Sequence, residues 1–100
     1  MPPITVLITY QARPERVAEA TRALRRLVAT VVASESDCGG IRLFHDADEP
    51  ARIVLVEEWT SREAYLGPHF QTPHLQAFIA GAGELFAGPP EIRFLEPAAD

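Results

Sequence analysis

The sequence contains no lysine and no asparagine, and it has a single cysteine, Cys38. Without lysine the chain cannot form a Schiff base on a side-chain amine, and without asparagine no step can use that amide as a donor. One cysteine cannot form an internal disulfide and is too few for a cysteine-based zinc site. These absences exclude Schiff-base enzymes, disulfide scaffolds and cysteine zinc sites.

Basic charge and long apolar runs are also scarce. The chain has nine arginines and fourteen acidic residues, which gives a formal net charge of -5, and its densest basic cluster is Arg25–Arg26. Binding to a phosphate backbone needs a concentrated basic patch, so we expect no nucleic-acid partner. No apolar run approaches the roughly 20 residues of a membrane helix, and the N-terminus lacks the features of a secretory signal. We therefore expect no membrane partner and a cytoplasmic location.

What is present predicts one globular domain over residues 1–100, because a chain of this length has room for one core. Alternating apolar residues predict a strand over 4–11, and apolar residues at helical spacing predict an amphipathic helix over 14–33. Cys38, Gly39 and Gly40 are expected to interrupt the chain before a hairpin, whose strands are predicted at 41–45 and 52–59.

Capping signals place two further helices. The segment 60–63, Thr-Ser-Arg-Glu, is typical of a capping box and predicts a short helix that ends at 67–68. Thr72 and Pro73 predict the start of another helix, with a buried stripe of Leu75, Phe78, Ile79, Ala82, Leu85 and Phe86. A last strand is predicted over 91–95. This order predicts an α+β fold, a four-stranded antiparallel sheet with its helices on one face.

One face of such a sheet needs a cover. Along 52–59 both alternating sets of side chains are largely apolar, and so are the neighbouring positions of 4–11. In a monomer, either the stripe of Leu7, Val54 and Val56 or its opposite would face water, which is uncommon. We predict a homodimer that stacks two sheets; the alternative is a monomer with a few exposed apolar residues.

Two histidines, His69 and His74, flank the start of the helix at Pro73. The positive potential of a helix N-terminus opposes imidazolium formation, so His74 is expected to be neutral near pH 7 and able to accept a phenolic proton. The alternatives are that His74 only packs at the helix start and that His69 is a solvated loop residue. Their spacing does not fit a helical zinc pair and no further ligand stands near, so we predict no metal site; we also expect no cofactor.

Aromatic and acidic residues precede these histidines. Aromatic residues at the positions of Trp59 and Tyr65 usually belong to the core. They would nevertheless offer a flat substrate a stacking surface and, at Tyr65, a hydroxyl group. Of Glu57 and Glu58, one is expected to point inward and to pair with an arginine of the hairpin, Arg42 or Arg52, rather than to act in catalysis.

Several short motifs carry a family resemblance. They are Gly39 with Asp46, Asp-Glu-Pro at 48–50, Glu-Glu-Trp at 57–59, His-x-x-Thr-Pro-His-Leu at 69–75 and Ala-Gly-Pro at 87–89. In this order the chain resembles the antibiotic biosynthesis monooxygenase family, a group of dimeric α+β barrel proteins with a ferredoxin-like fold. The resemblance implies a homodimer with one cavity per subunit between sheet and helices. It implies site residues at His69 and His74, and candidate lining at Trp59 and Tyr65.

Well-studied members of this family oxidise quinols or anthrone-like polyketide phenols with O2 and without metal, flavin or nicotinamide. The resemblance therefore implies a cofactor-independent monooxygenase acting on a small aromatic substrate. In this hypothesis Leu75, Phe78 and Ile79 form the apolar wall around the substrate. This hypothesis needs both imidazoles, His69 and His74, to line a dry chamber beneath the sheet. The alternative is a non-catalytic dimeric module that binds an aromatic ligand or serves a stress response. A small-molecule isomerase is less favoured, and so is a heme-degrading enzyme, because heme-degrading relatives use an asparagine that this chain lacks.

Overall fold

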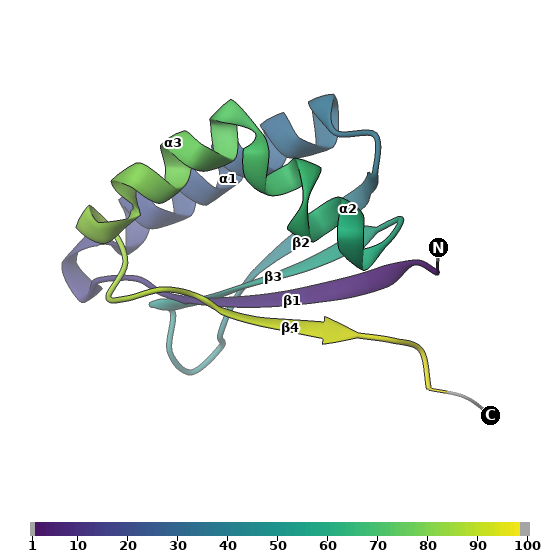
Figure 1. Cartoon of the computed structure of the whole chain (residues 1–100). Helices are drawn as coiled ribbons and strands as arrows, with labels where there is room; N and C mark the ends of the chain where they lie inside the picture. The colour runs from purple at the N-terminus through teal and green to yellow at the C-terminus, as the bar shows by residue number, and fades with distance from the viewer. Residues whose placement is uncertain (1, 99–100) are drawn as a thin grey trace.

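Four antiparallel strands form one sheet in the order β2–β3–β1–β4 (Figure 1). The computed structural model describes residues 2–98. The strands are β1 (Ile4–Gln11), β2 (Cys38–His45), β3 (Arg52–Trp59) and β4 (Glu91–Leu95). The central strand β1 pairs with β3 on one side and with β4 on the other. This topology confirms the predicted α+β, ferredoxin-like fold.

The helices all lie on one face of this sheet. They are α1 (Val17–Ser34), α2 (Arg62–Leu66) and α3 (Pro73–Gly81), with short 3-10 turns η1 (Pro14–Arg16), η2 (Pro68–Gln71) and η3 (Ala82–Glu84). In Figure 1, α1 and α3 run side by side above the strands, and the opposite face carries no helix. None of the helices that the structure describes is long and apolar enough to cross a membrane.

Side-chain caps fix where α2 and α3 begin. Thr72 accepts a hydrogen bond from the Leu75 amide at 3.4 Å, as the sequence predicted for α3. At α2 the capping residue is Ser61, which accepts from the Ala64 amide at 3.0 Å. The capping box predicted over 60–63 is therefore wrong by one residue. The Thr60 hydroxyl instead donates to Asp37 Oδ1 at 2.8 Å and ties the end of β3 to the turn after α1.

The Cys-Gly-Gly segment does not interrupt the chain as predicted but forms the first residues of β2. Its pairing with β3 is irregular between Cys38 and Gly40, where an extra residue is inserted. Gly40 has a φ of 147°, a conformation that favours glycine because a side chain there would be strained. Glycine at this position therefore bends the edge strand without ending it.

The alternation of β1 and β3 decides which side chains enter the core. The set facing the helices is buried: Ile4, Val6, Ile8, Tyr10, Ile53, Leu55, Glu57 and Trp59. Leu24 and Val31 of α1 close over it. Leu7, Val54 and Val56 lie on the uncovered face and are only half-buried. Of the two faces considered above, the one bearing these three residues is open.

Candidate functional site

A cavity of about 250 Å³ lies between the sheet and the helices. Most of its wall is apolar: Ile8, Leu27, Val28, Val31, Ile41, Leu55, Phe70, Leu75, Ile79, Pro89, Pro90 and Ile92. Side chains with polar groups enter the wall at four positions, Tyr10, Glu57, Tyr65 and His69. A mostly apolar cavity with a few polar groups suits a small organic ligand.

The predicted site residues divide between this cavity and its surroundings. His69, Tyr65 and Leu75 line it. Trp59 and Phe78 do not, although Trp59 lies directly behind His69, with 4.6 Å between the ring centroids. Ile79 was predicted in the buried stripe of α3, but it is 52% exposed, although it lines the cavity.

Aromatic clusters stand at two places around the cavity. In the first, Tyr65 stacks on His69 at 5.1 Å with an interplanar angle of 29°, and Trp59 packs edge-on against Tyr65 at 5.5 Å. In the second, Tyr10 packs against Phe86 at 4.9 Å and Phe78 at 6.1 Å. Rings held on several sides keep their orientation, which gives the cavity a fixed shape.

His69 is held by a carboxylate that the sequence analysis did not single out. Its Nδ1 lies 2.9 Å and 3.0 Å from the two oxygens of Glu35, the residue after the last turn of α1. Burial lowers the pKa of His69, and the neighbouring Glu35 only partly opposes this shift. His69 is therefore mainly neutral at pH 7.

The contact with Glu35 also fixes the tautomer of His69. A neutral imidazole carries one N–H, and a carboxylate can only accept, so Nδ1 donates to Glu35 and Nε2 keeps its lone pair. Nε2 has no hydrogen-bond partner among residues 2–98. His69 thus lines the cavity and carries one ring nitrogen that is able to accept a proton.

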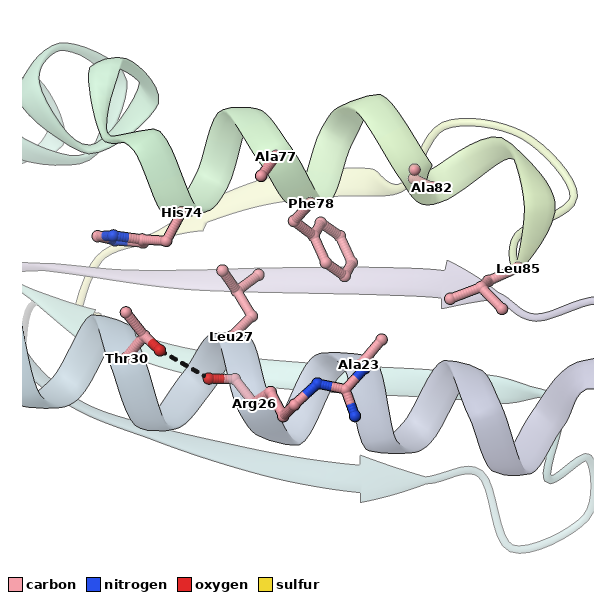
Figure 2. Close-up of a pocket in the computed structure, with 10 residues that line it drawn as sticks. Ala23, Arg26, Leu27, Thr30, His74, Ala77, Phe78, Ala82 and Leu85 are labelled. Atoms are coloured by element: carbon pink, nitrogen blue, oxygen red, sulfur yellow. Dashed lines mark hydrogen bonds between the residues drawn. The ribbon is translucent and has the colours of Figure 1, made fainter.

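His74 shares the same carboxylate from the other side. Its Nε2 lies 2.6 Å from Glu35 Oε2. His74 does not line the cavity but a separate open groove of about 420 Å³ between α1 and α3. Figure 2 shows this groove, with Leu27 of α1 and Phe78 of α3 pointing toward each other between the two helices. The expectation that both imidazoles line one chamber is therefore wrong for His74, because α3 directs it outward beside α1.

The sequence around Glu35 contains no signal for a functional residue. Glu35 stands in a polar segment, Ser-Glu-Ser-Asp, just after an amphipathic helix, and such a segment is typical of a solvated turn. It lies 34 residues from His69 and 39 from His74 in the chain. In the described part of the chain, no three His, Cys, Asp or Glu side chains are grouped so that they could hold a metal ion.

Glu57 is a second carboxyl group near the site. Unlike the half-buried Glu35 it is buried, with 4% of its surface exposed, and it lies on the floor of the cavity. Its Oε1 accepts a hydrogen bond from Trp59 Nε1 at 2.9 Å. Burial raises the pKa of Glu57 to about 7, against the opposing effect of the Trp59 bond.

The predicted arginine partner of Glu57 is wrong. Arg42 pairs with Val56 in the sheet, so it points to the open face, where its guanidinium lies over the Phe44 ring at 4.9 Å. Arg52 pairs instead with Asp46 and Glu49 in the hairpin turn. Strand alternation places both arginines on the side away from Glu57.

Comparison with known proteins adds family relationships to this geometry. The sequence model of the family described as antibiotic biosynthesis monooxygenase matches residues 3–81. An uncharacterized protein from Synechocystis sp. is 30% identical over 96 residues, which is 96% of this chain. The chain spans 64% of the length of that relative.

Solved structures resemble the whole fold. The structure of Rv0793 from Mycobacterium tuberculosis has a TM-score of 0.84 at 28% identity and covers 98% of this chain and 97% of its own. PA3566 from Pseudomonas aeruginosa has a TM-score of 0.87 at 28% identity, with 99% and 97% covered. A protein from Caulobacter crescentus, described as a candidate antibiotic biosynthesis monooxygenase, has a TM-score of 0.87 at 28% identity, with 98% and 92% covered.

Proposed function

The chain belongs to the antibiotic biosynthesis monooxygenase family, and from this membership we propose that it oxidises an electron-rich phenol, quinol or anthrone-like polyketide to a quinone with O2. The observation that carries the proposal is the free lone pair of His69 Nε2 beside an apolar cavity, with Nδ1 held by Glu35. The description of the similar Caulobacter crescentus protein as a candidate monooxygenase supports the same reaction class.

In this proposal His69 is the catalytic base. Its Nε2 takes the phenolic proton, and the hydrogen bond from Nδ1 to Glu35 stabilises the imidazolium that forms. Glu35 and His74 are positioning residues: Glu35 orients His69, and His74 donates to the second side of the carboxylate. Tyr65 lies against His69 in the wall, and Trp59 packs behind both rings.

The phenolate then reduces oxygen directly. It transfers one electron to O2, and the phenoxyl radical and superoxide combine to form a carbon–oxygen bond. The resulting peroxide anion takes the proton from His69 to become a hydroperoxide, and loss of water at the carbon that carried hydrogen leaves a carbonyl group. One phenol and one O2 thus give one quinone and one water. The apolar walls, including Leu75, keep the radical pair away from bulk water.

Oxygen uptake tests this function. Metal-stripped protein is mixed with a panel of hydroquinones, naphthols and anthrones, and O2 consumption is followed together with quinone absorbance. We expect at least one compound to consume one O2 per quinone, well above its autoxidation rate without protein. If the whole panel shows only autoxidation, the monooxygenase proposal is wrong, and the non-catalytic aromatic-binding module becomes the better description.

We also propose that a second copy of the chain covers the open face of the sheet. Leu7, Val54 and Val56 form its apolar centre, and Phe44 and Leu95 beside them are 40% and 43% exposed. Burying such a stripe against its own copy would give a symmetric dimer.

Replacing Val56 with arginine is expected to abolish this dimer, because it places two unpaired charges at the centre of the interface. Sedimentation equilibrium measures the mass, which should be twice the 11.0 kDa of the chain for the wild type and 11.0 kDa for Val56→Arg. Val32→Arg is the matched control, since Val32 is an exposed valine of α1, away from the open face. A wild type of 11.0 kDa at high concentration would rule out the dimer.

A further inference from the structure

The cavity contains a carboxyl group that the proposed reaction does not use. Glu57 stands on the sheet floor, next to Leu55 on one side and Trp59 on the other along the same face of β3. Only its Oε1 is bonded, to Trp59 Nε1. Its Oε2 has no partner among the residues that the structure describes.

Two hydroxyl groups of the cavity wall also lack a hydrogen-bond partner. Neither the Tyr10 nor the Tyr65 hydroxyl makes a hydrogen bond within residues 2–98, although both residues are at least 94% buried. No polar side-chain atom in this range is sealed off without a partner, so these oxygens and Glu57 Oε2 keep contact with open space. Glu57 and Tyr65 line the cavity, and Tyr10 lines both the cavity and the adjacent pocket beside Phe86. We therefore infer that the space open to Glu57 Oε2 is the cavity.

An apolar residue would be the stable choice at position 57. Its neighbours on this face of β3, Ile53 and Leu55, are almost completely buried. A carboxyl group in such surroundings loses its hydration, and one bond from Trp59 replaces only part of it. An arginine could neutralise the group, but within residues 2–98 no arginine forms an ion pair with it. A bound ligand that donates to Oε2 would supply the missing bond.

We propose that Glu57 Oε2 accepts a hydrogen bond from a hydroxyl group of the bound aromatic compound, at a point separate from His69, so that Glu57 selects hydroxylated ligands. This inference rests on the proposed function for the aromatic nature of the ligand. With His69 Nε2 as the other acceptor, the cavity then fits a planar compound that carries at least two oxygen substituents. Glu57 touches the ligand without taking part in the electron transfer.

The charge state of Glu57 sets the condition for a test. Its pKa of about 7 means that at pH 8 the group is mainly an ionised acceptor, which can bind a hydroxyl but not a methoxy group. A dihydroxynaphthalene and its monomethyl ether differ in this donor and in one methyl group, and the comparison with Glu57→Gln separates the two effects. Affinities are measured by calorimetry under nitrogen, so that no oxidation follows binding, for the positional isomers and their ethers.

We expect the wild type to bind at least one dihydroxynaphthalene about 10-fold or more tightly than its monomethyl ether, because a hydrogen bond to a charged group is replaced by an unpaired carboxylate. Glu57→Gln keeps an oxygen for Trp59 but presents an amide N–H₂, so the preference should fall to about 3-fold or less. Glu58→Gln is the control: Glu58 lies on the opposite face of β3, bonded to Thr5, and should leave the preference unchanged.

Each outcome decides the matter. A preference that survives in Glu57→Gln, or a wild type that binds without any preference, overturns the role of Glu57 while leaving the monooxygenase proposal standing. A Glu57-dependent preference without O2 uptake would support the role and contradict the reaction. No binding by any compound overturns the role. If Glu57→Gln does not fold, Glu57→Asp is used as the variant in its place. Its side chain is one methylene shorter, so the carboxylate oxygen lies further from the ligand hydroxyl.

Discussion

Replacing His69 with glutamine is expected to lower kcat for quinone formation by about 10²- to 10⁴-fold, the usual contribution of a positioned general base. A glutamine amide can still donate to Glu35, but it cannot accept the phenolic proton. Because His69 is buried and the new side chain is similar in size, the thermal unfolding profile serves as the check that the fold is retained. Initial rates of O2 uptake measure the effect.

His45→Gln is the matched control, because His45 lies in the hairpin, bonded to the Pro50 carbonyl and remote from the cavity. His74→Gln should cost less than His69→Gln, since His74 acts only through Glu35. In Glu57→Gln, which lacks the second titrating group of the cavity, kcat/KM should rise with pH through a His69 pKa below 6.5 and then level off, because only the neutral ring is a base. A rate that His69→Gln leaves intact would remove His69 from the mechanism.

Replacing Glu57 with glutamine is expected to stabilise the protein more at high pH than at low pH. The free energy of unfolding of Glu57→Gln minus that of the wild type should be about 3 kcal/mol larger above pH 7 than at pH 4.5. The pKa of Glu57 is raised from 4.5 in the unfolded chain to about 7 in the folded protein, so the folded state holds the proton longer. Stability contributed by this group is complete below pH 4.5 and is lost as the pH rises to 7. Each pH unit of that interval is worth about 1.4 kcal/mol.

Urea unfolding at pH 4.5, 6 and 8 measures this effect as the difference between variant and wild type. His69 acts in the opposite direction, because its lowered pKa makes the folded state gain stability as the pH rises toward 6.5. That contribution is present in both proteins and cancels in the difference. Glu58→Gln, on the exposed side of the same strand, should show no such trend. A difference for Glu57→Gln that stays constant from pH 4.5 to 8 would contradict the raised pKa.

Local sequence patterns were sufficient for the order of the strands and helices, although the helix predicted to include Leu85 and Phe86 ends at Gly81. Alternation over 4–11 and 52–59 marked β1 and β3 with their correct bounds, and the Thr72–Pro73 pair marked the start of α3. These features depend on the backbone period and on capping groups within a few residues. The same patterns misplaced the first residues of β2, because a bulged glycine strand and a break have the same composition.

The contents of the site were harder to predict. The sequence pointed to His69, Tyr65 and Leu75, which the fold brings to the cavity, and also to His74, Trp59 and Phe78, which it does not. It gave Glu57 an arginine partner that strand alternation turns to the opposite face. Residues that are close together on one helix or strand can point their side chains in different directions. Periodicity predicts the face on which a residue lies, but it does not predict which residue of another element packs against it.

The sequence by itself determined the ferredoxin-like topology, one apolar sheet face that needs a cover, and the presence of two imidazoles near one helix start. Only the tertiary structure decided that Glu35 holds both imidazoles, that His69 alone faces the cavity, and that Glu57 is left with a free oxygen there. The physical reason is the distance along the chain over which each kind of interaction acts. Periods and caps act over one or two turns of chain, whereas the site forms where the end of α1 meets η2 and α3, more than 30 residues away along the chain.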